Sequence, residues 1–188
     1  MKSRFEFSGT VIFAALLASI LALATAATPQ TPDTSTASLQ DTLTWLSNYL
    51  PSATGETYSD GGVPITITTQ ISGWNGCTIT LVITTVDSPT TLNGGSTVAG
   101  GTFTQRDVYS LSDIDSNSVK VDTQAGIWVL MNSSTNSIQE TYRHSDGTNS
   151  QSMKTLTGAA SFNDQSGAER AANAFRHAVN LCAKSQPF

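Results

Sequence analysis

Two histidines are the natural start of a search for catalytic residues, because histidine transfers protons readily near neutral pH. His144 is followed by Ser145 and Asp146, so the three residue types of a hydrolytic triad stand side by side. Adjacent residues cannot adopt the nucleophile–base–orienter geometry that acyl transfer requires, and this stretch is typical of a turn. His177 falls on the polar flank of a predicted helix. We therefore predict no catalytic residue, with both histidines solvated at the surface.

The spacing of acidic and cysteine residues does not favour a metal site. Asp113, Asp115 and Asn117 occupy the first, third and fifth positions of a calcium-loop pattern, but the sixth position is not glycine and the twelfth is not glutamate. Zinc requires clustered ligands, whereas the two cysteines are about 100 residues apart. We therefore predict no metal and no cofactor, and a turn between strands at these acidic residues.

One aromatic side chain is a candidate binding residue. Trp74 lies in the sequence SGWNGC, residues 72–77, which separates two runs of alternating apolar and hydroxyl residues. An exposed aromatic ring at a hairpin tip can contact another protein or a glycan. The alternative is that the ring folds back over the sheet. Trp128 is expected in the core and Trp45 beside the apolar stripe of the first helix.

The residues on either side of Trp74 predict a β-hairpin that spans about residues 63–86, because apolar residues recur there with a period of two. A two-residue turn at Asn75 and Gly76 would place the two apolar stripes on opposite faces of the sheet. A three-residue loop that ends at Gly76 gives one apolar face, with Ile71 opposite Ile79. We therefore predict the three-residue loop, with Gly76 at positive φ.

The first predicted helix covers residues 38–51. Ser38 and Asp41 have the spacing of a capping box, with Asp in place of Glu. Leucines follow at helical spacing and mark the buried face. Pro51 marks the predicted end of the helix.

The second predicted helix covers residues 166–184 and begins with Ser166 and Glu169 at capping-box spacing. Its apolar stripe ends at Cys182, and the core-facing stripe of the second hairpin strand begins at Cys77. In an oxidising compartment these two residues would pair. We predict the Cys77–Cys182 disulfide; the alternative is two buried or unpaired thiols.

The N-terminus has the pattern of a cleavable signal peptide over residues 1–27, with two basic residues, an apolar core at 11–24 and small residues at the cleavage site. No cysteine follows that would carry a lipid anchor. We predict a disordered linker at 28–37, a single globular domain at 38–184 and a tail at 185–188. The expected location is secreted or periplasmic.

The net charge excludes two classes of partner. The full chain carries a formal charge of −5, and cleavage of residues 1–27 would remove two basic residues and one acidic residue to leave −6. An acidic chain is repelled by nucleic acid and by anionic lipid. We therefore expect the partner to be an envelope or extracellular protein, or a glycan.

Further strands are expected between the hairpin and the last helix, at about 104–111, 118–123, 126–133, 137–143 and 153–157, and a long loop is expected at 87–101. The run GIWVLM is apolar at every position from 127 to 131, so that strand is expected to be covered on both faces. The predicted fold class is α+β: an antiparallel sheet, or a barrel like that of pleckstrin-homology domains, of about seven strands with one helix at each end.

The element order resembles the pleckstrin-homology-like barrel. The segments YSLSDID (109–115) and ERAANAFRHAVNLC (169–182) also resemble secreted bacterial domains of uncharacterised function, and the resemblance covers about residues 38–184. Phosphoinositide-binding members of the pleckstrin-homology fold use basic residues around the first hairpin. Loop 72–77 has neither Lys nor Arg, so that ligand is not implied here.

With no assembled catalytic motif, the favoured hypothesis is a secreted or periplasmic, non-catalytic interaction module. One alternative is a hydrolase whose site is assembled from distant residues, and another is a purely structural extracellular domain. A pocket that joined His144 to Asp107 or Asp122 would favour the hydrolase. An apolar patch with Trp74 exposed would favour binding.

Overall fold

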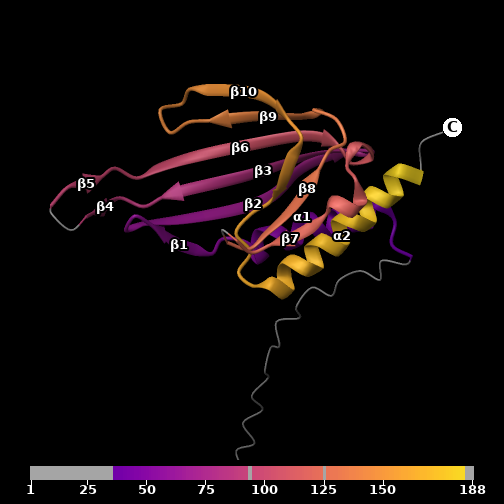
Figure 1. Ribbon diagram of the computed structural model, residues 1–188, viewed down its shortest axis with the longest axis horizontal. Coiled ribbons are helices and arrows are strands. Elements are labelled where there is room, and N and C mark those ends of the chain that lie inside the picture. The colour runs from indigo at the N-terminus through magenta and orange to yellow at the C-terminus, as the bar shows by residue number, and fades with distance from the viewer. Residues whose placement is uncertain (1–35, 93–94, 125, 185–188) are drawn as a thin grey trace, which may run out of the picture.

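The computed structural model describes residues 36–92, 95–124 and 126–184 (Figure 1). The predicted signal peptide, most of the predicted linker and the predicted tail lie outside the described residues. Within the described ranges, no helix is both long enough and apolar enough to cross a membrane.

The described chain is α+β, as predicted, with one α-helix at each end. The helices are α1 (Leu39–Ala53) and α2 (Gln165–Lys184), and two short 3-10 helices are η1 (Leu111–Asp113) and η2 (Ser116–Ser118). The strands are β1 (Thr57–Asp60), β2 (Val63–Asn75), β3 (Thr78–Asp87), β4 (Thr90–Thr91), β5 (Thr97–Val98), β6 (Gly101–Ser110), β7 (Lys120–Asp122), β8 (Trp128–Asn132), β9 (Ile138–Arg143), β10 (Asn149–Lys154) and β11 (Leu156–Ala159).

The strands form two sheets and a short ribbon. A six-stranded antiparallel sheet has the order β1-β2-β3-β6-β9-β10, and a three-stranded sheet has the order β11-β8-β7. The sheet does not close into a barrel, since β1 and β10 are its two edges. After β10 the chain continues into β11 of the second sheet, and β10 does not pair with β1. The predicted loop at 87–101 contains the ribbon formed by β4 and β5.

Helix α1 begins as predicted and ends later. The Ser38 hydroxyl accepts a hydrogen bond from the Asp41 N–H at 3.1 Å, and the Asp41 carboxylate accepts one from the Ser38 N–H at 3.2 Å. The predicted end at Pro51 is wrong, since the helix continues to Ala53. Proline removes one N–H but leaves the next turn intact, and the Thr54 N–H still bonds to the Leu50 carbonyl.

Helix α2 begins one residue earlier than predicted and uses a different cap. The Asp164 carboxylate accepts a hydrogen bond from the Gly167 N–H at 2.6 Å. The predicted capping box of Ser166 and Glu169 is therefore wrong, because Ser166 already lies in the first turn of the helix. Asp164 satisfies an N–H of that turn in its place.

The hairpin of β2 and β3 has one apolar face, as predicted, but a different register. The predicted three-residue loop is wrong: Asn75 pairs with Thr78, and the turn consists of two residues, Gly76 and Cys77. Gly76 has φ of +55°, which confirms the predicted left-handed conformation. The predicted pairing of Ile71 with Ile79 is wrong: Ile71 pairs with Leu81. The ladder shifts between Ile71 and the next paired residue, and this irregularity keeps the apolar side chains on one face.

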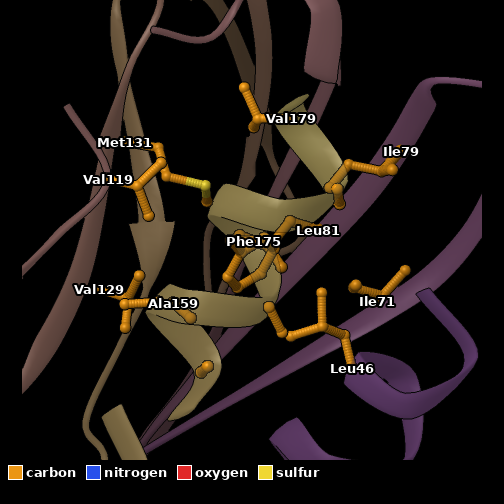
Figure 2. Packing of buried hydrophobic residues seen from close by; sticks show 14 of the residues in the cluster. Leu46, Ile71, Ile79, Leu81, Val119, Val129, Met131, Ala159, Phe175 and Val179 are labelled. Atoms are coloured by element: carbon orange, nitrogen blue, oxygen red, sulfur yellow. The ribbon is translucent and has the colours of Figure 1, made fainter. Parts of the chain in front are cut away.

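The main hydrophobic core lies between the inner face of the six-stranded sheet, the two helices and the three-stranded sheet. Figure 2 shows Phe175 of α2 among Leu81 of β3, Leu46 of α1 and Val129 of β8. Phe175 and these three neighbours are fully buried. A second, smaller cluster of buried residues, formed by Ile67, Ile83 and Ala160, lies between β2, β3 and the end of β11.

The predicted disulfide is present. Cys77 and Cys182 are bonded, with their Cα atoms 5.7 Å apart and 105 positions apart in the chain. The bond joins the last turn of α2 to the turn between β2 and β3, which is the placement that the two apolar stripes predicted.

Candidate functional site

A groove lies between the two sheets, beyond the part of the inner face that the helices cover. In Figure 1, β8 crosses in front of the six-stranded sheet. Residues of both sheets line a cavity of about 200 Å³. A second cavity of about 410 Å³ adjoins it and shares Ile67 and Trp128. We call the two cavities together the inter-sheet groove. Its lining residues are Glu56, Tyr58, Ile67, Ile83, Thr85, Phe103, Gln105, Gly126, Trp128, Leu130, Tyr142, Lys154, Leu156, Thr157, Gly158 and Ser161.

Strand β8 separates the groove from the main core. Val129 and Met131 are fully buried in the core cluster, whereas Trp128 and Leu130 line the groove. Side chains of a strand alternate between its faces, so a run that is apolar throughout places apolar side chains both on the core and on the groove. The prediction that this strand is covered on both faces is confirmed, but Trp128, which was expected in the core, is only partly buried and lines the groove.

Hydrogen bonds fix the second sheet over the first. Thr69 interrupts the apolar stripe of β2 and is almost fully buried. Its hydroxyl accepts a hydrogen bond from the Ala160 N–H at 2.9 Å. Ala160 follows β11 directly, so this bond holds the end of β11 against β2 and maintains the separation of the groove walls.

A buried carboxylate lies beneath one end of the groove. Asp107 is fully buried, and Thr157 donates a hydrogen bond to its Oδ2 atom at 2.5 Å. The Gln105 amide donates to the same carboxylate at 3.1 Å, and the Lys154 ammonium contacts it at 2.9 Å. Because these three partners all line the groove, the charge of Asp107 orients the polar side chains at that end.

A second carboxylate shares the same ammonium group. Lys154 Nζ lies 2.6 Å from Oε2 of Glu140, and the Ser152 hydroxyl donates to Oε1 at 2.9 Å. Partial burial raises the pKa of Glu140, but the hydrogen bonds from Lys154 and Ser152 outweigh it and hold the pKa below its ordinary value. Glu140 pairs with Asp107 across β9 and β6, so the ammonium neutralises part of the repulsion between two adjacent carboxylates.

The groove opens at two exposed side chains that are largely apolar. Tyr58 is 46% exposed beside the larger cavity, and Leu156 is 44% exposed beside the smaller one. Large hydrophobic side chains usually bury more of their surface. Their position at the mouths of a hollow indicates that apolar surface could be covered there by a bound molecule.

The structure does not bring the candidate hydrolase residues together. His144 is exposed, as predicted, and packs edge-on against the Tyr142 ring with centroids 4.7 Å apart. The Asp122 carboxylate accepts a hydrogen bond from the Gln124 N–H. None of His144, Asp107 and Asp122 lines either cavity of the groove.

The other predicted site residues lie elsewhere. Trp74 is partly buried against the core, and its Nε1 donates to the Gln40 side chain at 3.0 Å, so its ring lies beside the start of α1. His177 is partly buried, with Nε2 2.9 Å from the carbonyl of Ala37, which differs from the solvated position predicted for it. Neither residue lines the groove.

The acidic segment that has part of a calcium-loop pattern forms turns between strands, as predicted. Asp113 ends η1, and the Asp115 carboxylate accepts a hydrogen bond from the Asn117 N–H at 2.9 Å as the cap of η2. Across the part of the chain that the structure describes, no group of three or more His, Cys, Asp or Glu side chains is arranged to hold a metal ion.

Comparison with protein-family models, with curated proteins and with solved structures finds no match to this chain. The geometry of the inter-sheet groove is therefore the main indication of what the protein does. Sequence reasoning did not find this site, because its lining comes from strands distributed over the whole sheet region. The one available signal was the two-sided apolar run at 127–131.

Proposed function

We propose that the protein is a secreted, non-catalytic binding module that holds a small, largely apolar molecule in the inter-sheet groove. The observation that carries the proposal is a hollow with largely apolar walls between the two sheets. Protein interiors are normally packed with few voids larger than a water molecule. A hollow of this size between two sheets matches the usual form of a ligand site.

The chemistry of the walls supports this function. Phe103, Trp128 and Tyr142 supply aromatic surface, and Ile83 and Leu130 supply aliphatic surface. Covering such surface stabilises a complex by about 25 cal/mol for each Å² removed from water. Gln105, Lys154 and Thr157 form one polar cluster in the smaller cavity, and a cluster of this kind can orient a ligand in its pocket. Glu56 and Ser161 add polar groups beside the larger cavity.

The buried carboxylate supports binding rather than acid–base catalysis. Asp107 does not line the groove, and Gln105, Lys154 and Thr157 lie between it and the hollow. A general base must reach the proton that it removes, directly or through one water molecule. We therefore assign Asp107 the role of orienting these three side chains.

The disulfide supports the extracellular part of the proposal. A bond between Cys77 and Cys182 is compatible with an oxidising compartment, and disulfides of this kind are rare in reducing ones. Residues 1–27 have the sequence pattern that would direct the chain there.

A dye-binding experiment tests the proposed function. N-phenyl-1-naphthylamine is an uncharged apolar dye that fluoresces when it leaves water, and we expect it to bind the native protein saturably. Thr85→Phe should fill the groove and weaken dye binding at least about tenfold. Thr84→Phe is the matched control, because Thr84 is the adjacent residue on the opposite face of β3, and it should bind as the unmodified protein does.

The outcome is decisive in both directions once circular dichroism shows that both variants are folded. Loss of binding in Thr85→Phe alone supports the groove as the site. Absence of saturable binding to the unmodified protein, or an equal loss in the two variants, contradicts the proposal.

A further inference from the structure

We infer that the groove selects an uncharged molecule with a hydroxyl group at one end of an apolar body, and that it discriminates against both carboxylates and amines of the same shape. This inference rests on the proposed function and names the class of ligand. It is carried by the arrangement of charges at the polar end of the groove.

At the polar end of the groove, the negative charges outnumber the positive charge. Among the described residues that line the two cavities, Lys154 is the one cationic side chain. Its ammonium group already contacts Asp107 at 2.9 Å and Glu140 at 2.6 Å, so the three groups together carry one net negative charge. Glu56 adds a further, exposed carboxylate beside the larger cavity.

A ligand carboxylate therefore finds no net attraction. Near Lys154 it would meet one positive charge but also the two carboxylates that flank this ammonium at hydrogen-bond distance. Coulomb energy falls only as the inverse of distance, so the two repulsions offset most of the single attraction. The cost of taking the ligand charge out of water is then left uncompensated.

A ligand amine gains little net attraction at this end of the groove either. Asp107 and Glu140 attract an ammonium through space as they repel a carboxylate, but Lys154, the member of the three that lines the groove, repels it and offsets most of that attraction. Asp107 is fully buried and the oxygens of Glu140 already accept hydrogen bonds from Lys154 and Ser152, so neither offers the ammonium a new hydrogen-bond acceptor. Glu56 is exposed, so water screens its charge. The cost of taking the ammonium out of water is again left uncompensated.

The hydrogen-bonding capacity that remains suits a hydroxyl group. An ammonium group has three N–H donors, and within the described residues Lys154 uses two of them, on Asp107 and Glu140. The Thr157 hydroxyl gives its one hydrogen to Asp107 and keeps lone pairs that can accept. A ligand hydroxyl can accept a hydrogen bond from the ammonium group of Lys154 and donate one to a threonine or amide oxygen. A ligand carboxylate or ammonium could bind there only if its charge were taken out of water.

A competition experiment tests this inference. Decanol, decanoate and decylammonium have alkyl chains of one length, and each is titrated at neutral pH into protein saturated with N-phenyl-1-naphthylamine. We expect decanol to displace half of the dye at a concentration at least about tenfold below that needed with either ion. Displacement by decanoate or decylammonium at an equal or lower concentration overturns the inference and leaves the proposed function standing. Failure of the dye itself to bind removes the proposed function.

Glu140→Gln separates charge from shape. Glutamine keeps the size of the side chain and its capacity to hydrogen-bond Lys154, but it changes the net charge of the group from one negative to zero. We expect decanoate to bind at least roughly fivefold more tightly to this variant, with decanol nearly unchanged. Equal changes for decanol and decanoate would show that the charge arrangement does not select the ligand, and would overturn the inference.

Discussion

At the scale of single residues, the informative group is the buried carboxylate of Asp107. A charge of this kind is tolerated only when hydrogen bonds and an opposite charge replace the water that it loses. Gln105, Lys154 and Thr157 supply them here from three different strands or strand ends. The hydrogen bond from Thr157 to the Asp107 carboxylate therefore links the two sheets, since Asp107 lies on β6 and Thr157 on β11.

Removal of one donor tests that connection. Thr157→Val keeps the shape of the side chain but leaves Asp107 without its closest hydrogen bond, so we expect a loss of about 1–3 kcal/mol in the free energy of unfolding. Urea denaturation measures this loss. Thr155→Val is the control, because Thr155 is exposed two residues earlier, and a change of equal size there would contradict the assignment.

Glu140 gives the protein a dependence of stability on pH. Partial burial raises its pKa, but the hydrogen bonds from Lys154 and Ser152 and the charge of Lys154 together outweigh burial and lower the pKa below the unfolded value. A lowered folded-state pKa adds stability above the unfolded pKa, and this contribution is lost as the pH falls through the folded value. We expect the free energy of unfolding to decrease between about pH 5 and pH 3, and to do so less steeply in Glu140→Gln. Equal slopes for the two proteins would count against this role.

At the scale of elements, the sequence predicts faces better than registers. The period-two pattern correctly placed the apolar residues of β2 and β3 on one face, and the pairing of Ile71 still differed by two residues on the partner strand. A shift of two residues leaves every side chain on its own face, so hydrophobic pattern alone cannot choose between such registers. The irregularity after Ile71 and the turn at Gly76 and Cys77 set the observed one.

The start of α2 also could not be placed from local sequence alone. Asp164 and Ser166 are both good capping residues, and the spacing of Ser166 to Glu169 favoured the second. The choice depends on contacts distant in sequence: Phe162 is fully buried, and the Asn163 side chain donates to the Ser52 carbonyl. These contacts fix where the chain can begin to turn.

A pair of substitutions tests the cap. Asp164→Ala removes the side chain that accepts from the Gly167 N–H, and we expect it to lower the free energy of unfolding by about 1 kcal/mol. Ser166→Ala should change it by a few tenths at most, because alanine suits the first turn of a helix. Thermal denaturation of both variants gives the comparison, and a larger loss for Ser166→Ala would refute the assigned cap.

The disulfide is the strongest single connection between elements. It closes a loop of 105 positions between the β2–β3 turn and the end of α2. The chain-entropy model gives a stabilisation of about 4–5 kcal/mol for a loop of this length. We expect the double change Cys77→Ala and Cys182→Ala to cost about 2–5 kcal/mol in urea denaturation. Addition of a reductant should destabilise the unmodified protein and leave the double variant unchanged; equal responses would contradict this role.

At the scale of the whole molecule, the groove exists because two sheets meet over one face. The sequence indicated that Trp128 and its neighbours form a strand covered on both sides, and that much is confirmed. It did not indicate what covers each side, because the chain passes directly from β10 to β11 and changes sheet at Thr155. Long-range pairing of this kind carries no local signal, so the groove could not be assembled from the sequence.

One glycine allows β11 to pair closely with β8 in the sheet that forms one wall of the groove. A Cβ atom built at Gly158 would lie 2.2 Å from the Val129 carbonyl oxygen, a backbone atom that cannot turn aside. Gly158→Ala must therefore push β11 away from β8, and we expect a loss of about 1–3 kcal/mol in the free energy of unfolding. Gly73→Ala is the matched control, because a Cβ there meets nothing within 4 Å and its φ lies outside the left-handed region.

The place at which Gly158→Ala loosens the structure distinguishes a local separation of β11 from β8 from a general loss of stability. Amide hydrogen exchange should become faster first in β11 and β8, which Gly158 joins, and the dye should bind more weakly as the wall formed by Leu130 moves. Exchange in α1 and near the turn of the β2–β3 hairpin should change less below the global unfolding limit, because α1 packs in the main core and the disulfide joins the hairpin turn to α2. If Gly158→Ala proved as stable as Gly73→Ala, with unchanged exchange in β11, the close contact between β11 and β8 would not define the groove, and the site proposed there would lose its structural basis.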